Sequence, residues 1–511
     1  MSGITSETNK RMAKNTVYLY LRMIVLMLIA LYTSRAFLDA LGVDDYGIYN
    51  IVGGFVSLLS LITGSMTMGA QRFISFAIGK KEPANLHRTF STFTNLFLIL
   101  AVAIFLIFGL IGHWVVYDLL NLPSGRLDAA LFCYYCSLLA FSVNIIAIPY
   151  MAAVISHEKM DFYAMVSILE SLLKLIIVYA LYTTSFDRLK VYACLLAIVG
   201  LAIRFIYGLY CSKKFPETTH CRVIDRKILK EAFFFTFWMA FGNAVVVAKE
   251  QGVNILINLF CGVAMNAARG ISVQVSSVMS QFGNSIASAI NPQITKSYAS
   301  GNWNRSVNLT FLLTKAEGLM LLVIALPLYF EMNFLLEIWL KNVPYYAEVF
   351  AKWIVILSVL TPLRNCYGPL YMATGDVKTL QWSTSIIYIL ILPLSYAALR
   401  LGYEPVVTMQ ITAVIEVITW IASYYYMEYK FKFPLGRYIK EAILPLILIA
   451  LFTSVILYSI QILFSGNNFW RFFLVCVVSV IMLASLSYCF LLSKNEKAFV
   501  VKIVQSKFSH K

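Results

Sequence analysis

Apolar stretches long enough to cross a bilayer recur along the whole chain, and this recurrence restricts the fold more than any other feature. A spanning helix needs about 20 mostly apolar residues, and stretches such as Leu96–Ile111 and Ile443–Leu463 are almost continuously apolar. Only helices and closed barrels satisfy their own backbone hydrogen bonds in hydrocarbon. Barrel strands would alternate between apolar and polar residues, and these stretches do not. We therefore predict an all-α integral membrane protein.

About 14 transmembrane helices are expected from the spacing of these stretches. The predicted spans are residues 16–34, 46–78, 93–112, 129–153, 162–183, 191–211, 232–261, 266–295, 306–330, 348–373, 380–399, 406–427, 441–463 and 472–493. The connections between them are short. The longest, residues 212–231, is strongly basic.

The distribution of Lys and Arg predicts the orientation of the chain. If the N-terminus is cytoplasmic, the cytoplasmic segments hold 25 of the 41 Lys and Arg residues and the outer segments hold 7. Because positive charge gathers on the cytoplasmic side, both termini are predicted to be cytoplasmic. The same rule accounts for the net charge of +16, so the basic composition does not indicate nucleic-acid binding.

Composition and loop length argue against an enzyme. The chain is 60% hydrophobic and 13% charged, which leaves no room for a soluble domain. The longest outer loops, residues 113–128 and 331–347, are short, and no Asp-x-Asp sequence occurs. Cys133 and Cys136 have the spacing of a redox or metal pair, but without a second pair they are better read as small buried apolar residues. No metal or cofactor is expected.

An internal repeat is indicated at an offset of 220 residues. Gly42-Val43 then aligns with Gly262-Val263, and Ile74-Ser75 aligns with Ile294-Thr295. With an even number of spans in each half, the repeats would be parallel, and a pair of parallel bundles leaves a cleft for substrate. The predicted division is a first six-helix bundle (1–211), a basic cytoplasmic linker (212–231), a second pseudo-symmetric six-helix bundle (232–428), and two additional C-terminal helices with a basic tail (429–511).

Four groups of motifs carry a resemblance to a known family. They are Leu-Gly-Val-Asp-Asp-Tyr-Gly-Ile-Tyr (Leu41–Tyr49) before a helix ending near Arg72, Ile148-Pro149-Tyr150 before His157-Glu158-Lys159-Met160, Asn291-Pro292 with Ser300-Gly301-Asn302, and Ala373-Thr374-Gly375-Asp376. Together they resemble the polysaccharide and O-antigen flippases of the multidrug/oligosaccharidyl-lipid/polysaccharide exporter superfamily. The resemblance implies a V-shaped pair of six-helix bundles that moves a lipid-linked oligosaccharide between leaflets.

Charged residues inside the predicted spans are the strongest functional signal, because each costs a few kcal/mol at that depth and is therefore expected to have a function. The cations outnumber the anions. The cations are Arg22, Arg72, Lys174, Arg204, Lys249, Arg269, Lys315, Lys352 and Arg364, and the anions clear of the span ends are Glu170, Glu250, Glu317 and Glu416. Excess positive charge in a cleft attracts an anion such as a diphosphate.

Some of these charges have simpler explanations. Glu170 and Lys174 have the spacing of an intrahelical ion pair, and Arg204 and Lys352 are close enough to span ends to reach the headgroups. Five cations are predicted to line a substrate-binding cleft, with buried structural pairing as the alternative: Arg22, Lys249, Arg269, Lys315 and Arg364. Pro362 and Pro369 flank Arg364 and predict a broken helix there.

The resulting hypothesis is a flippase that uses alternating access in the bacterial inner membrane. Its cargo would be an undecaprenyl-diphosphate-linked oligosaccharide repeat unit for O-antigen, capsule or exopolysaccharide synthesis. Its partners would be membrane lipids and the polymerase and glycosyltransferases of the same pathway, with Na⁺ or H⁺ left open as coupling ion. One alternative is a cation-coupled multidrug exporter of the same superfamily, and a second is a membrane-bound polymerase or glycosyltransferase.

Overall fold

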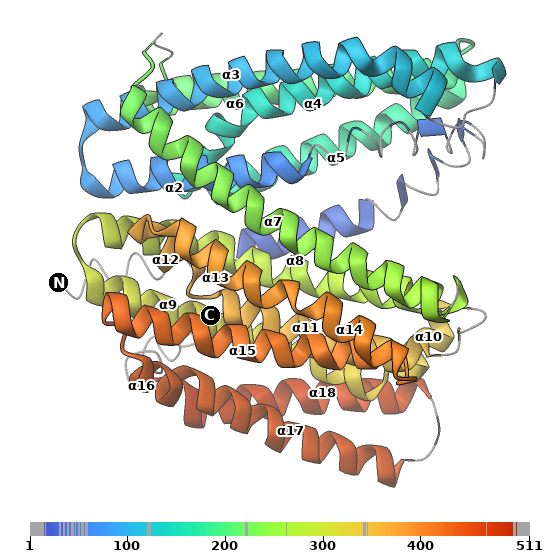
Figure 1. Ribbon diagram of the computed structural model, residues 1–511, viewed down its shortest axis with the longest axis vertical. Coiled ribbons are helices and arrows are strands. Elements are labelled where there is room, and N and C mark those ends of the chain that lie inside the picture. The colour runs from blue at the N-terminus through green and yellow to red at the C-terminus, as the bar shows by residue number, and fades with distance from the viewer. Residues whose placement is uncertain are drawn as a thin grey trace, which may run out of the picture. The chain divides into compact units, whose positions relative to one another are not determined.

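The computed structural model describes residues 60–119, 124–219, 223–261, 263–340, 346–464 and 468–493, most of residues 15–29, single positions between 32 and 56, and residues 344, 466 and 497. Every regular element in these residues is a helix (Figure 1). About a third of the predicted second span, most of the Leu41–Tyr49 motif and nearly all of the chain after Ser493 lie outside the described residues.

Most of the helices follow the predicted spans. They are α2 (Ser60–Lys80), α3 (Pro83–Trp114), α4 (Leu127–Ser156), α5 (Met160–Thr183), α6 (Arg188–Lys214), α7 (Arg226–Cys261), α8 (Val263–Ala299), α9 (Trp303–Phe330), α11 (Ala347–Asn365), α12 (Gly368–Thr374), α13 (Val377–Ile389), α14 (Ile391–Arg400), α15 (Val407–Phe431), α17 (Leu444–Leu463) and α18 (Phe469–Leu486). Two short helices lie outside the predicted spans, α10 (Met332–Trp339) and α16 (Leu435–Tyr438).

Eleven helical segments of the described chain are long and apolar enough to span a membrane, and each coincides with a predicted span. The other three predicted spans fall on the apolar helix Val17–Ile29 and on α2 and α8, which are helical but richer in polar residues. The all-α membrane fold is therefore confirmed, and the helices are consistent with about 14 spans.

Two predicted spans are interrupted in the structure. Residues 348–373 form α11 and α12, separated by a turn at Cys366 and Tyr367, with Pro362 inside α11. This confirms the predicted break beside Arg364. The span at 380–399 also divides, into α13 and α14. Residues 331–347, predicted to be a loop, contain the eight-residue helix α10.

The chain forms two compact units. Unit 1 comprises residues 1–244, 288–303 and 372–378, and unit 2 comprises residues 245–287, 304–371 and 379–511. Both units contain parts of α7 and α8. The division predicted at residues 211, 231 and 428 follows the sequence repeat, whereas these two units are defined by the contacts within each of them. The predicted division therefore stays a prediction.

Unit 1 is built around α4, which packs against α2, α3 and α6 (Figure 1). Phe90, Phe93 and Tyr134 are fully buried in this core. At one end of the unit the Arg126 guanidinium binds two carboxylates, those of Asp45 and Asp187, each with a closest contact of 2.6 Å.

Unit 2 places α11 against α15, and it includes the pair α17 and α18 (Figure 1). α9 is its most buried candidate span. Arg471 in α18 forms an ion pair of 2.7 Å with the buried carboxylate of Glu331, which precedes α10. This contact fixes the start of the last long helix to the rest of the unit.

Candidate functional site

Three of the five predicted site cations lie together in unit 2. Lys249 of α7 and Arg364 of α11 both approach the ring of Tyr388 in α13, at 4.9 and 5.3 Å from its centroid. Arg269 of α8 joins them through Glu250, which it shares with Lys249. We refer to Lys249, Glu250, Asn254, Arg269, Arg364, Tyr388 and Glu416 as the ion-pair cluster.

One side of the cluster is a buried pair between Arg364 and Glu416. Arg364 Nε lies 3.0 Å from Glu416 Oε2, and the Glu416 side chain is only 2% exposed. The Tyr388 hydroxyl donates to the same carboxylate, at 2.8 Å from Oε1 and 2.9 Å from Oε2. Because a buried charge needs both a partner and hydrogen bonds, Tyr388 completes the environment of Glu416.

The other side of the cluster is centred on Glu250. Its carboxylate lies 3.1 Å from Lys249 Nζ and 3.0 Å from Arg269 Nη2. Arg269 also donates to the side-chain oxygen of Asn254 and, at 3.3 Å, to the carbonyl oxygen of Glu250. Lys249 and Arg269 are buried, whereas 45% of the Glu250 side chain is exposed. Among these three side chains, Glu250 is therefore the exposed one.

The cluster carries more positive than negative charge. Three cations, Lys249, Arg269 and Arg364, are matched by the two carboxylates Glu250 and Glu416. Arg269 Nε is also buried without a hydrogen-bond partner in the described part of the chain. An anion bound here would be attracted by the remaining positive charge, in surroundings where screening by water is reduced.

Helix ends position two members of the cluster. Arg364 lies in the last turn of α11, before the turn at Cys366 and Tyr367, where the C-terminal carbonyl groups favour a cation. Tyr388 lies in the last turn of α13, before its junction with α14. Each of the two interrupted spans therefore supplies one partner of the Arg364–Tyr388 contact.

The remaining two predicted cations lie outside this cluster. Lys315 is buried near the middle of α9. Arg22 belongs to unit 1, where its guanidinium lies 4.6 Å from the centroid of the Tyr163 ring. Arg22 Nε is buried without a hydrogen-bond partner among the described residues. Substrate contact by any of the five cations stays a prediction.

Other sequence interpretations can be compared with the structure directly. Lys174 and Glu170 form the predicted intrahelical ion pair, at 2.6 Å, and both are exposed to more than a third. Cys133 and Cys136 are free thiols. Within the described residues, no group of His, Cys, Asp and Glu could hold a metal ion.

Tyr388 and Asn254 were not anticipated from the sequence. Tyrosines near span ends are expected at the membrane interface, but Tyr388 is near the middle of the span predicted at 380–399. A tyrosine at that depth usually has a hydrogen-bond partner for its hydroxyl, so its position in the span could have indicated a polar neighbour. Nothing in the sequence around Asn254 distinguishes it from other polar residues of α7.

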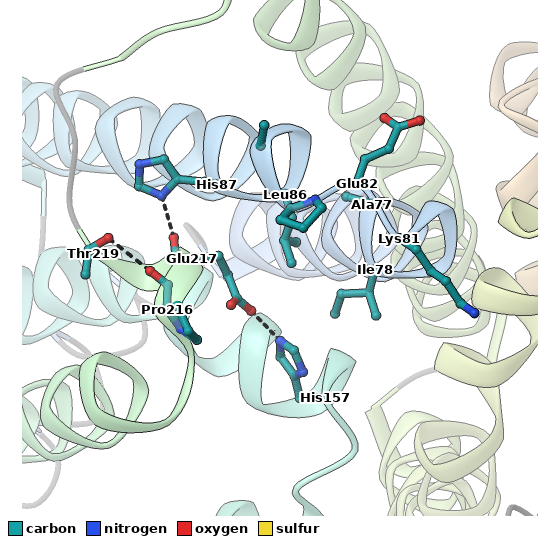
Figure 2. A pocket seen from close by; sticks show the side chains of 12 residues that line it. Ala77, Ile78, Lys81, Glu82, Leu86, His87, His157, Pro216, Glu217 and Thr219 are labelled. Carbon is teal, nitrogen blue, oxygen red and sulfur yellow. Dashed lines mark hydrogen bonds and ion pairs between the residues drawn. The ribbon is translucent and has the colours of Figure 1, made fainter.

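A separate cavity of about 630 Å³ lies in unit 1, and none of the five predicted cations lines it. Figure 2 shows His157 and His87 directed toward Glu217 from two different elements. His157 forms an ion pair with the Glu217 carboxylate, and His87 Nδ1 lies 3.0 Å from the Glu217 carbonyl oxygen. The walls also include Ile78, Leu86 and Pro216, which make the cavity mainly apolar.

Glu217, in the wall of this cavity, is expected to make the stability of the protein depend on pH. Burial raises the pKa of Glu217, but the hydrogen bond from His157 and further interactions outweigh burial, so the net pKa is below its ordinary value. A carboxyl with a depressed pKa stabilises the fold above its ordinary pKa and loses that contribution as the pH falls through the lowered value. We expect Glu217→Gln to reduce the acid-induced fall in the unfolding temperature of the purified protein. A variant profile parallel to that of the wild type would contradict this.

Comparison with known proteins identifies the family of this chain. The model of a family described as polysaccharide biosynthesis proteins matches residues 12–298, more than half of the chain. No curated protein matches the chain in sequence.

Solved structures share the fold at low sequence identity. A MATE protein in the bent conformation has a TM-score of 0.70 at 13% identity, over 82% of this chain and 96% of its own. An outward-facing multidrug resistance MATE family transporter of the MOP superfamily has a TM-score of 0.67 at 12% identity, over 81% and 94%. A MOP superfamily transporter from Pyrococcus furiosus, described by the reverse polarity of its binding pocket, has a TM-score of 0.63 at 12% identity, over 81% and 96%.

Proposed function

We propose that this chain, which belongs to the polysaccharide biosynthesis protein family, moves an anionic lipid-linked oligosaccharide from the inner to the outer leaflet of a bacterial inner membrane. The fold is that of MOP-superfamily transporters. The observation that carries the proposal is the ion-pair cluster, in which three buried cations meet two carboxylates. A diphosphate linkage is an anion suited to such a group, because Arg and Lys bind phosphate oxygens through charge-assisted hydrogen bonds.

Transport of this kind needs a protein pathway. Each unsatisfied polar group costs several kcal/mol in hydrocarbon, so a diphosphate and its sugars do not cross unaided. Alternating access, with the polar head inside the protein and the polyprenyl tail in lipid, would avoid that cost. Glycosyltransferases would act before this step, and a polymerase would act after it.

A multidrug exporter with the same fold is the main alternative. A pump for cationic drugs needs carboxylates that are free to attract them. In the ion-pair cluster both carboxylates, Glu250 and Glu416, already have basic partners. The Pyrococcus furiosus transporter described by a pocket of reversed polarity has a similar fold, so this fold is compatible with pockets of either charge.

Orientation can be tested by reporter fusions. With both termini cytoplasmic, fusions after residues 220, 435 and 505 should report a cytoplasmic location, and fusions after residues 120 and 467 should report a periplasmic one. The expected result follows from the concentration of Lys and Arg in alternate connections. A periplasmic signal at residue 220 would contradict the predicted six-plus-six arrangement.

Deletion of the gene tests the proposed function itself. Complete oligosaccharide-lipid should accumulate in the cytoplasmic leaflet, and the surface polysaccharide should be lost. The measurement is extraction of polyprenyl-linked glycans and determination of their sidedness with an impermeant glycan-modifying reagent. Complementation with Lys174→Ala, which alters an exposed pair, should restore export. Normal delivery to the outer leaflet would refute transport, and an incomplete repeat unit would favour an enzyme.

A further inference from the structure

Glu317 differs from the other buried glutamates of the described chain. Four glutamates are buried there: Glu158, Glu317, Glu331 and Glu416. Three of them form an ion pair, Glu158 with Lys296, Glu331 with Arg471 and Glu416 with Arg364. Glu317 is 6% exposed, and no Lys, Arg or His of the described residues forms an ion pair with it.

The surroundings of Glu317 in unit 2 are compact and weakly polar. The Cys366 thiol lies 3.4 Å from Glu317 Oε2 and, equally, 3.4 Å from the carbonyl oxygen of Pro362. Its single hydrogen therefore has two competing acceptors. On the other side, a Cβ atom at Gly283 of α8 would lie 2.7 Å from Glu317 Oε1, so the carboxyl occupies the space that this glycine leaves.

Two side chains that interact electrostatically with Glu317, those of Cys366 and Tyr438, are neutral in ordinary conditions. Cys366 lies at the turn between α11 and α12, and Tyr438 lies in α16, where its hydroxyl meets those of Thr314 and Tyr424 at 3.0 and 2.7 Å. The neighbouring part of α8 contributes Gly283. A carboxylate in such surroundings lacks both water and a counter-ion, and these conditions favour the neutral acid.

We propose that Glu317 is a proton-binding site whose protonation is coupled to transport, an inference that rests on the proposed function. The carboxylate takes one proton from water on one side of the membrane and becomes a carboxylic acid, and it returns that proton to water on the other side. The hydroxyl of the acid can then donate to Cys366 or to a neighbouring oxygen. Hard metal cations require several oxygen ligands, whereas the side chain that contacts this carboxyl is a thiol, so the ligand is H⁺ rather than Na⁺.

Release of the proton requires water to reach the carboxyl. Glu317 lies between a glycine on α8 and the interruption between α11 and α12. Residues at the ends of helices are the positions that absorb changes in φ and ψ when a protein opens at a hinge. Opening at the turn of Cys366 would hydrate Glu317, and closing would return it to its unpaired, buried state.

Infrared difference spectroscopy of the purified full-length protein tests the protonation directly. At neutral pH the wild type should show the carbonyl stretching band of a buried carboxylic acid, shifted in D₂O, and Glu317→Gln should lack it. Gln has the size of the neutral acid, so this variant is expected to fold, as the unfolding temperature will show. Glu170→Gln is the matched control, because Glu170 is half-exposed and paired with Lys174, and it should retain the band. Persistence of the band in Glu317→Gln would overturn the proposal.

Transport in vesicles tests the coupling, with oligosaccharide-lipid extracted from the deletion strain as the probe. An imposed pH gradient should accelerate transport by the wild type several-fold, whereas Glu317→Gln should keep only the gradient-independent rate. Equal acceleration of both proteins would overturn the coupling. If the band is lost in Glu317→Gln but the wild type moves no oligosaccharide, the proton site stands and the proposed cargo fails.

Discussion

Arg364→Ala is expected to lower the free energy of unfolding by about 3–5 kcal/mol, because it leaves a buried carboxylate without its cation. The Glu416 side chain is 2% exposed and lies 3.0 Å from Arg364 Nε. The Tyr388 hydroxyl would still donate its single hydrogen to this carboxylate, but it does not supply a positive charge. The effect should appear as a lower unfolding temperature of the purified protein and as reduced abundance in the membrane.

A double variant separates stability from transport. Replacement of both partners, as Arg364→Leu with Glu416→Leu, removes the unpaired charge and should recover most of the stability, since a buried pair is often replaceable by apolar residues. Transport should remain lost if Arg364 contacts the substrate. Lys174→Ala breaks an exposed pair and should change stability by less than about 0.5 kcal/mol. A stable Arg364→Ala protein would show that Glu416 is not held as a carboxylate by this pair.

The spans were predictable from the sequence because the bilayer imposes a length and a polarity on every crossing segment. The interruption near Arg364 was also predictable, because Pro362 removes a backbone donor within the helix. The helix α10 was not. It has only eight residues, and although they are largely apolar, they are too few to cross a bilayer, so the criterion of span length did not indicate a helix there.

The partners of the buried charges could not be predicted in the same way. Lys249 and Glu250 are adjacent, and their side chains leave a helix about 100° apart, yet they form an ion pair, and Glu250 also pairs with Arg269 from α8. Glu416 meets Arg364 through the packing of α15 on α11, and it meets Tyr388 of α13 through a hydrogen bond. Such pairings depend on which helices are neighbours, and hydrophobic periodicity does not contain that information.

Two substitutions in the ion-pair cluster should change anion affinity in opposite directions. Glu250→Gln removes the carboxylate shared by Lys249 and Arg269 while keeping an oxygen that accepts hydrogen bonds. Two buried cations are then less neutralised, and affinity for an anion should rise about fivefold, or ~1 kcal/mol, for a partly screened charge. Lys249→Gln removes a cation and should lower the affinity by a similar factor. Binding of farnesyl diphosphate to the purified protein, measured by calorimetry, provides the comparison.

The opposite signs are what distinguish a binding site from a structural pair. If the cluster only holds α7, α8, α11 and α13 together, both substitutions destabilise the protein and neither changes diphosphate affinity in a charge-dependent way. If the cations face the substrate, the affinity of both variants should depend on salt concentration, because added ions screen the accessible charge. The matched pair Glu170→Gln and Lys174→Gln makes the same charge changes at an exposed site of unit 1, and it should leave diphosphate binding unchanged. If the control pair changed the diphosphate affinity by the same factors, the effect would come from the net charge of the protein, and the ion-pair cluster would not be the anion site.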